Sequence, residues 1–206
     1  MPFSKRTPGS LREYAYWLWE TAQRVPSLVR TESGADGIDG RFREEVMLAV
    51  TAVNDCRYCR FVHGSLAEYE GVELDEIQKM MKTDWEPGDQ RLAAAVHYAR
   101  ECAEAGKLPP SKASRAALGR LFDEKEVRAI EASIAGIMVG NLTGNTFDAL
   151  LARFTGERRF REEGWVREAV IASAALAGGL SALAMGAAAR GAARLPFRRR
   201  LRAAQR

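Results

Sequence analysis

Two cysteines and a histidine are spaced so that a single helix would carry them on one face. They are Cys56, Cys59 and His63, in the pattern Cys-x-x-Cys-x-x-x-His. Side chains at positions i, i+3 and i+7 of an α-helix lie along one stripe. A thiol with an imidazole one turn away is well placed to become a thiolate, the nucleophilic form of cysteine. The spacing therefore predicts thiol chemistry along an exposed stripe of a helix.

The position of each thiol on this helix predicts a different property. Cys56 falls in the first turn, where free backbone N–H groups and the helix dipole favour an anion. His63 is one turn from Cys59 and can take its proton. A second thiol nearby can attack an oxidised sulfur and close a disulfide, which prevents irreversible over-oxidation. Helix geometry thus makes Cys56 the more acidic thiol and places the base beside Cys59.

An acidic residue on the preceding segment completes the candidate site. Glu44 lies twelve residues before Cys56. If Asn54–Asp55 joins two antiparallel helices, the carboxylate comes close to His63 or Cys56, where it would orient the imidazole or relay protons through a water. Spacing alone does not choose Glu44 over Glu45.

The stretch from Glu44 to Gly64 resembles the signature of the alkylhydroperoxidase D and carboxymuconolactone decarboxylase superfamily. The matching pattern is Glu44, eleven residues, and then Cys56-Arg57-Tyr58-Cys59-Arg60-Phe61-Val62-His63-Gly64. The approach over residues 37–43 is also similar, and residues 145–150 resemble a region of peroxidase-related members. The resemblance covers roughly residues 10–156, and its specific part is 38–71.

The resemblance implies an all-helical fold that assembles as trimers or hexamers. In the peroxidase branch, the position of Cys59 becomes a sulfenic acid, and that of Cys56 is the proton donor and disulfide partner. The positions of His63 and Glu44 relay protons, and a dithiol reductant such as a lipoyl or thioredoxin-like protein returns the electrons. The decarboxylase branch usually lacks the cysteine pair, so both thiols favour the redox branch. Tyr58 stands between the cysteines, where the best-studied peroxidase has a histidine.

The function expected from these residues is that of a thiol-dependent peroxidase or dithiol oxidoreductase acting on hydroperoxides. Cys59 is the expected nucleophile, Cys56 the resolving thiol, His63 the base and Glu44 the orienting or relaying group. No flavin, haem or nucleotide motif is visible, and this chemistry requires no cofactor.

Several alternatives remain open at this stage. In a carbon-acid reaction, such as a decarboxylation, His63 and Glu44 would do acid–base work and the cysteines would be incidental. A redox-sensing module would use the disulfide as a switch without turnover. The cysteines could also be buried and inert, or could bind zinc with His63 and a fourth ligand, for which His97 and Cys102 are the candidates.

Helical periodicity and capping signals predict an all-α chain. Helices are expected near residues 11–25, 41–53, 56–70, 74–81, 89–105, 123–139 and 147–154, with a short one after Ser111. Pro26 is expected to stop the first helix, and Gly140 and Gly144 to interrupt the last long one. No alternating hydrophobic run indicates a strand.

The last forty-odd residues differ in composition from the rest of the chain. We expect a helical domain over residues 1–160 and an Ala-rich helix with an Arg-rich tail over 161–206. The net charge of +4 is concentrated in that tail, because no acidic residue follows Glu168. Charge gathered in this way does not indicate a nucleic-acid-binding fold.

The uncharged segment at residues 169–189 has two readings. It is expected to pack on the domain or on a neighbouring subunit, because small residues favour close helix packing. The alternative is association with a membrane, either by insertion of this segment or through the arginines on anionic lipid. Three cysteines without a visible secretory signal favour the cytoplasm.

Overall fold

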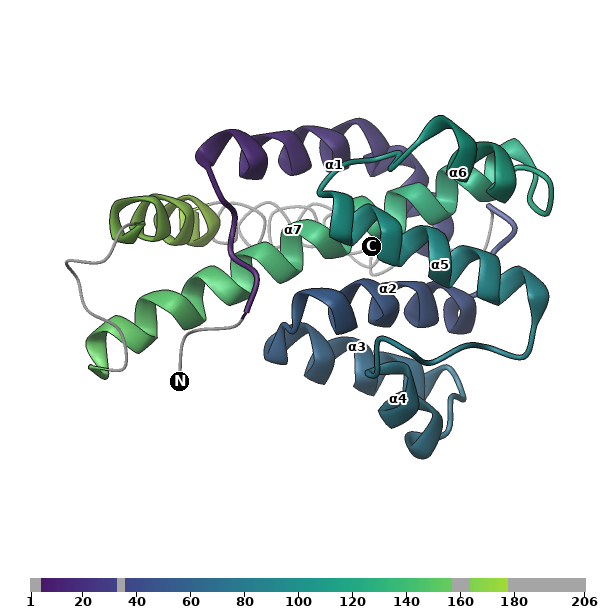
Figure 1. Cartoon of the computed structure of the whole chain (residues 1–206), viewed down its shortest axis with the longest axis horizontal. Coiled ribbons are helices and arrows are strands. Elements are labelled where there is room, and N and C mark those ends of the chain that lie inside the picture. Colours follow the sequence, from purple (N-terminus) through teal and green to yellow (C-terminus); the bar gives the residue numbers. More distant parts are fainter. Residues whose placement is uncertain (1–4, 33–35, 157–163, 178–206) are drawn as a thin grey trace, which may run out of the picture.

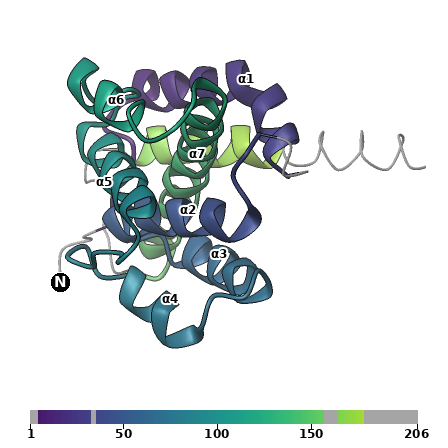
Figure 2. The ribbon, with the colours of Figure 1, turned by 90° about the vertical axis from the view of Figure 1, so that its right-hand side faces the viewer.

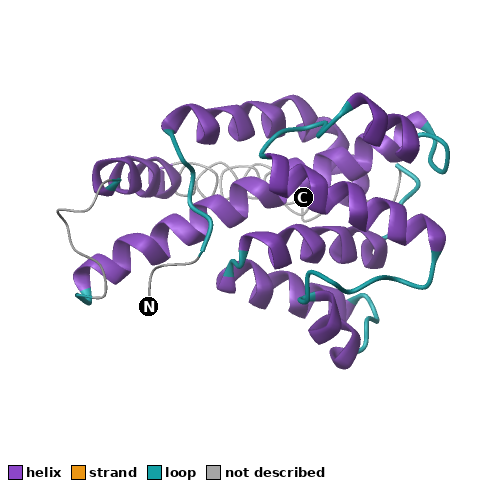
Figure 3. Cartoon of the chain, viewed as in Figure 1, coloured by secondary structure: helices purple, strands orange, loops and turns teal. Residues whose placement is uncertain are grey.

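Helices make up all the regular secondary structure within residues 5–32, 36–156 and 164–177, which are the residues that the structure describes (Figure 3). In this computed structural model the elements are α1 (Leu11–Glu32), α2 (Gly40–Asn54), α3 (Arg57–Tyr69), α4 (Leu74–Met80), α5 (Gln90–Ala105), α6 (Lys112–Leu118) and α7 (Glu124–Phe154). A further helical stretch covers residues 165–177. The expected all-α class is confirmed.

The long helix α7 is the central element, and α1, α2, α3 and α5 all pack against it (Figures 1 and 2). It begins with a capping box, in which the Asp123 side chain accepts from the Glu126 N–H and the Glu126 side chain accepts from the Asp123 N–H. Such reciprocal caps satisfy N–H groups that have no partner inside the helix. Beyond the first turn, most α7 residues are buried, as expected for a helix enclosed by neighbours.

Helices α2 and α3 form an antiparallel hairpin with a very short connection. Asp55 adopts a left-handed conformation, with φ of 51°, and its N–H donates to the Thr51 carbonyl to close α2. Cys56 then caps α3. On α7, Asn145 Nδ2 donates to the Asn54 carbonyl at 2.6 Å and so fastens the turn to the central helix. This hydrogen bond therefore fixes where α3 begins relative to α7.

Helix α1 does not stop at Pro26, so the expected boundary is wrong. It continues to Glu32 with Pro26 inside it. A proline in a helix interior removes one hydrogen bond and crowds the preceding turn. The added turns offset this cost with tertiary contacts: Ser27 and Arg30 both donate to the buried Asp36 carboxylate.

Helix α7 is also continuous where two interruptions were expected. It runs through Gly140 and Gly144 to Phe154. Both glycines face the start of α3, and a Cβ added at Gly144 would lie 2.7 Å from Cys56 Sγ. These glycines lower helix propensity, but they allow α7 to approach the cysteines closely.

The start of the C-terminal extension packs on the main core. Ile171 is buried within the core cluster, and Glu168 forms two hydrogen bonds with Arg153 of α7, at 2.7 and 3.0 Å. The expected boundary near residue 160 and the Arg-rich tail lie outside the described residues, as does most of the 169–189 segment. Among the residues described, no helix combines the length and the apolarity needed to cross a membrane.

The close contact between α7 and Cys56 yields a testable pair of substitutions. Gly144→Ala should lower the free energy of unfolding by about 1–3 kcal/mol, because the added methyl group overpacks against the Cys56 sulfur. Gly136→Ala on the same helix is the control, since its methyl group would meet only Leu28 at 3.6–3.7 Å. Helix propensity should then make that variant up to about 1 kcal/mol more stable. Denaturant unfolding measures both, and an equal gain in the two variants would contradict the close contact.

Candidate functional site

The four residues expected to form the site meet as two pairs. Cys56 contacts Cys59, and Glu44 contacts His63. Among the described residues, no hydrogen bond joins His63 to either sulfur. The α2–α3 hairpin positions both pairs, because Glu44 lies on α2 and the other three residues lie on or next to α3.

The first pair is a hydrogen-bonded couple of free thiols. The two Sγ atoms are 2.9 Å apart and share a hydrogen bond. The Cys59 backbone N–H also donates to Cys56 Sγ, at 3.4 Å. Cys56 therefore occupies the N-cap position of α3, where a Ser, Thr, Asp or Asn oxygen usually accepts this bond. The sequence placed Cys56 within the first turn of this helix, one position further in than the structure does.

The sulfurs are buried rather than exposed, so the expectation of an exposed stripe is wrong on this point. Cys56 is 0% exposed and Cys59 is 8% exposed. The cause is the glycine row of α7: a Cβ at Gly140 would lie 3.7 Å from Cys59 Sγ, and one at Gly144 would lie 2.7 Å from Cys56 Sγ. The backbone of α7 thus covers both thiols from one side.

The hydrogen bonds shift the pKa values of the two thiols in opposite directions. Donation from the Cys59 thiol lowers the pKa of Cys56 to about 7, with further help from the backbone N–H groups of Cys59 and Tyr58 and against the effect of burial. The same hydrogen bond, together with burial, raises the pKa of Cys59 far above its ordinary value. The more acidic thiol is therefore Cys56, as its position at the helix N-terminus predicts.

The second pair is a buried carboxylate bound to an imidazole. Glu44 is 1% exposed, and its Oε2 lies 2.7 Å from His63 Nδ1. Its other oxygen, Oε1, accepts two hydrogen bonds from Arg43. Glu45 faces a different way and pairs with Arg41 at 3.0 Å. The structure thus makes the choice between Glu44 and Glu45 that spacing could not make.

An apolar groove lies beside the two glycines of α7. It has a volume of about 720 Å³ and is bounded by α1, α7, Tyr58 of α3 and the start of the C-terminal extension. Gly140 and Gly144, whose positions border the two sulfurs, also line this groove. Its polar groups include Tyr14 and Thr143, whose hydroxyl groups are hydrogen-bonded to each other at 2.7 Å. The same two glycines therefore border both the thiol pair and the apolar groove.

A buried acid beside the thiols ties the N-terminal segment to the site. Asp148 of α7 forms ion pairs with Lys5 and with Arg57, the residue that follows Cys56. These cations hold the pKa of Asp148 below its usual range despite burial. In turn, the Asp148 charge slightly opposes ionisation of Cys56.

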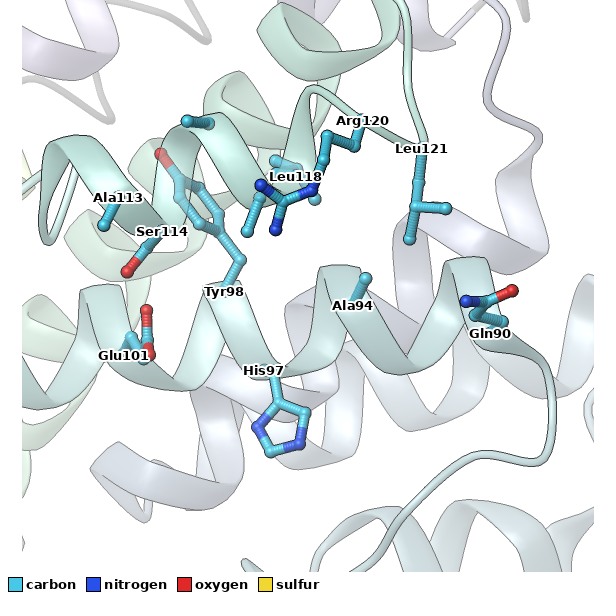
Figure 4. Close-up of a pocket in the computed structure, with 12 residues that line it drawn as sticks. Gln90, Ala94, His97, Tyr98, Glu101, Ala113, Ser114, Leu118, Arg120 and Leu121 are labelled. Atoms are coloured by element: carbon cyan, nitrogen blue, oxygen red, sulfur yellow. The ribbon is translucent and has the colours of Figure 1, made fainter.

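A second groove, of about 860 Å³, lies between α5 and α6 (Figure 4). Tyr98, His97 and Glu101 come from α5, and Ser114 comes from α6. None of its lining residues belongs to α2, α3 or α7, so it is separate from the thiol pair. It contains no cysteine.

The residues considered as further zinc ligands do not join the site. Cys102 is fully buried on α5, where burial raises the pKa of its thiol, and His97 faces Glu86 at 3.4 Å. Within the described ranges, no three His, Cys, Asp or Glu side chains lie close enough together to hold a metal ion.

Three contributors to the site were missed from the sequence. They are Arg43, which binds Glu44, and the two glycines of α7, which were interpreted as helix breaks. Arg43 directly precedes Glu44 in the sequence, so the closeness of the two residues was visible. The sequence did not show that the Arg43 side chain turns toward the Glu44 carboxylate. The four-residue spacing of Gly140 and Gly144 places them on one helix face and was the available signal of close packing.

Comparison with protein family models, with curated proteins and with solved structures found no match. The description of the site therefore rests on its residues and their geometry.

The thiol acidities predict a visible titration. In the reduced protein one thiolate should appear with a midpoint near pH 7, because the pKa of Cys56 is lowered, whereas a free cysteine titrates near about 8.5. Ultraviolet absorbance of the thiolate measures it. Cys56→Ser should abolish this step, and the control Cys102→Ser should leave it in place. A first thiolate that appears only near the ordinary cysteine value would show that Cys56 is not activated.

Proposed function

We propose that the Cys56–Cys59 pair is the redox centre of a thiol peroxidase that reduces hydroperoxides. One observation carries the proposal: the sulfurs of Cys56 and Cys59 share a hydrogen bond, and Cys56 Sγ also accepts one from the backbone N–H of Cys59. A single proton is then shared between two sulfurs, and one of them is charged near neutral pH. The likeness to the alkylhydroperoxidase D signature supports the same reading.

Access and acidity support different roles for the two thiols. Of the two residues, only Cys59 retains some exposed surface, whereas Cys56 is fully buried. Cys56 is the more acidic thiol and holds the charge at rest. In our proposal the proton of Cys59 moves to Cys56 along their 2.9 Å hydrogen bond. Cys59 thereby becomes the attacking thiolate, and Cys56 holds a proton for the leaving group.

In the first step the hydroperoxide oxidises Cys59. The Cys59 thiolate attacks the terminal oxygen of the hydroperoxide, so that an S–O bond forms and the O–O bond breaks. The alkoxide that leaves takes the proton from Cys56 and departs as the alcohol. Cys59 is oxidised to the sulfenic acid, and Cys56 becomes a thiolate again.

In the second step the Cys56 thiolate attacks the Cys59 sulfur. The S–S bond forms, the S–O bond breaks, and the hydroxide that leaves is protonated to water. A disulfide is about 2.05 Å long, so the sulfurs need to approach by only about 0.9 Å from their present separation. In our proposal the Glu44–His63 pair serves the proton transfers, and a bridging water completes its path to the sulfurs.

The oxidised centre needs two electrons to return to the dithiol state. We propose that a dithiol reductant, a lipoyl group or a thioredoxin-like protein, supplies them by thiol–disulfide exchange. The working form would be a homo-oligomer, a trimer or hexamer, as the family likeness implies. A cytoplasmic location fits the reduced state that this cycle needs.

A carbon-acid reaction is the second candidate, favoured by the fact that His63 is bound to Glu44 rather than to a sulfur. There the imidazole and carboxylate would move a proton to or from carbon without using the thiols. The double substitution Cys56→Ser and Cys59→Ser separates the candidates, because it removes peroxide reduction and spares a carbon-acid reaction.

Chemical trapping of the sulfenic acid tests the proposed roles. After treatment with an organic hydroperoxide, wild-type protein should give a Cys56–Cys59 disulfide by peptide mass spectrometry. Cys56→Ser should accumulate the trapped sulfenic acid on Cys59, because the resolving thiol is missing. Cys59→Ser should give little or none on the sealed Cys56. The control Cys102→Ser should behave as wild type.

Two outcomes would change the proposal. Label on Cys56 alone would reverse the roles of the thiols, and no oxidation of either sulfur beyond that of Cys102 would exclude a peroxidase. Sustained turnover with a lipoyl or thioredoxin-like reductant distinguishes an enzyme from a redox-sensing module, which would oxidise once and stop.

A further inference from the structure

The carboxylate of Glu44 is divided between two partners, one on each oxygen. Arg43 donates to Oε1 from Nε at 3.1 Å and from Nη2 at 3.0 Å. His63 Nδ1 lies 2.7 Å from Oε2. An arginine usually spreads two parallel bonds over both oxygens of a carboxylate. Here both bonds go to one oxygen, and the other is left to the imidazole.

Arg43 and Glu44 are both buried, so each charge needs the other as a partner. Arg43 is 7% exposed and Glu44 is 1% exposed. A charged carboxylate out of water is costly unless a cation or several donors face it. The guanidinium keeps its charge under all ordinary conditions, so it is a permanent counter-charge for Glu44. Adjacent residues of a helix do not normally face each other, so this contact is made through the ends of the two side chains.

The state of Glu44 decides the state of His63. A charged carboxylate can only accept hydrogen bonds, so the ring nitrogen facing it must carry the proton. In its neutral form His63 is then the Nδ1–H tautomer, with the lone pair on Nε2. That lone pair is the group able to take up or pass on a proton. A protonated or displaced Glu44 would no longer impose this choice.

We propose that Arg43 is a positioning residue, which keeps Glu44 charged and turned toward His63 and so fixes the imidazole in the tautomer that leaves Nε2 free to act as the base. The inference rests on the proposed peroxidase function for its consequence, but not for its geometry. Arg43 touches neither sulfur in the structure and acts through Glu44 and His63.

Nitrogen NMR of the histidine rings tests this role directly. The chain has only two histidines, His63 and His97, and a His97→Gln background leaves the signals of His63 alone. In wild type, His63 should be the Nδ1–H tautomer. Arg43→Met should shift it toward a mixture of tautomers, and Arg43→Lys should restore much of the wild-type signal because it keeps the charge.

A matched control lies two residues earlier on the same helix. Arg41 pairs with Glu45 at 3.0 Å, much as Arg43 pairs with Glu44. Arg41→Met should therefore leave the His63 signals unchanged. If Arg43→Met does not fold, Arg43→Lys and Arg43→Gln make the comparison, since only the former keeps the charge.

The rate of disulfide formation with an organic hydroperoxide provides the second readout. Arg43→Met should lower it by at least about tenfold, because a base in the wrong tautomer is ineffective. An unchanged tautomer together with an unchanged rate would overturn the role of Arg43. A tautomer change in a protein whose wild type forms no disulfide would retain that role and overturn the peroxidase instead.

Discussion

The sulfur of Cys56 caps helix α3 in the place where an oxygen usually does so. The arrangement of the rest of the site depends on this sulfur cap. The cap needs an acceptor for the first free N–H groups of α3. A thiol is a weak acceptor, and a thiolate is a strong one. The helix start and the thiol of Cys59 therefore favour the same charged state of Cys56. Secondary structure and reactivity are coupled at a single atom.

Neighbouring elements maintain this arrangement from two sides. On one side, Gly140 and Gly144 bring the backbone of α7 against both sulfurs. Across the hairpin, Glu44 and His63 form a pair that shares no hydrogen bond with the sulfurs among the described residues. A buried thiol pair and a separate carboxylate–imidazole pair thus lie on one hairpin. The same glycines also line the apolar groove.

The sequence was sufficient for the fold class and for naming the four residues that meet as two pairs. Helical spacing placed Cys56, Cys59 and His63 on one element, and caps such as Asp123 with Glu126 located helix starts. The acidity of Cys56 followed from its place in the first turn. These features are local, since each depends on residues within two turns, and periodicity describes local features well.

Features that depend on contacts between distant segments could not be predicted. Pro26 and Gly144 are helix breakers by propensity, yet tertiary packing keeps both inside helices. The burial of Cys59 depends on α7, about eighty residues further along the chain. Helical spacing placed His63 beside Cys59 but could not show that its ring is bound to Glu44, because a side-chain torsion decides between the two partners.

The most direct measurement of the central claim compares the folded protein with its own unfolded chain. The second-order rate of thiol oxidation by an organic hydroperoxide can be followed at neutral pH with and without denaturant, in a Cys102→Ser background. Our account predicts that the folded protein reacts at least about tenfold faster, because its geometry supplies a thiolate and a proton donor. A folded protein that reacts no faster than the unfolded chain would show that burial merely protects two inert cysteines.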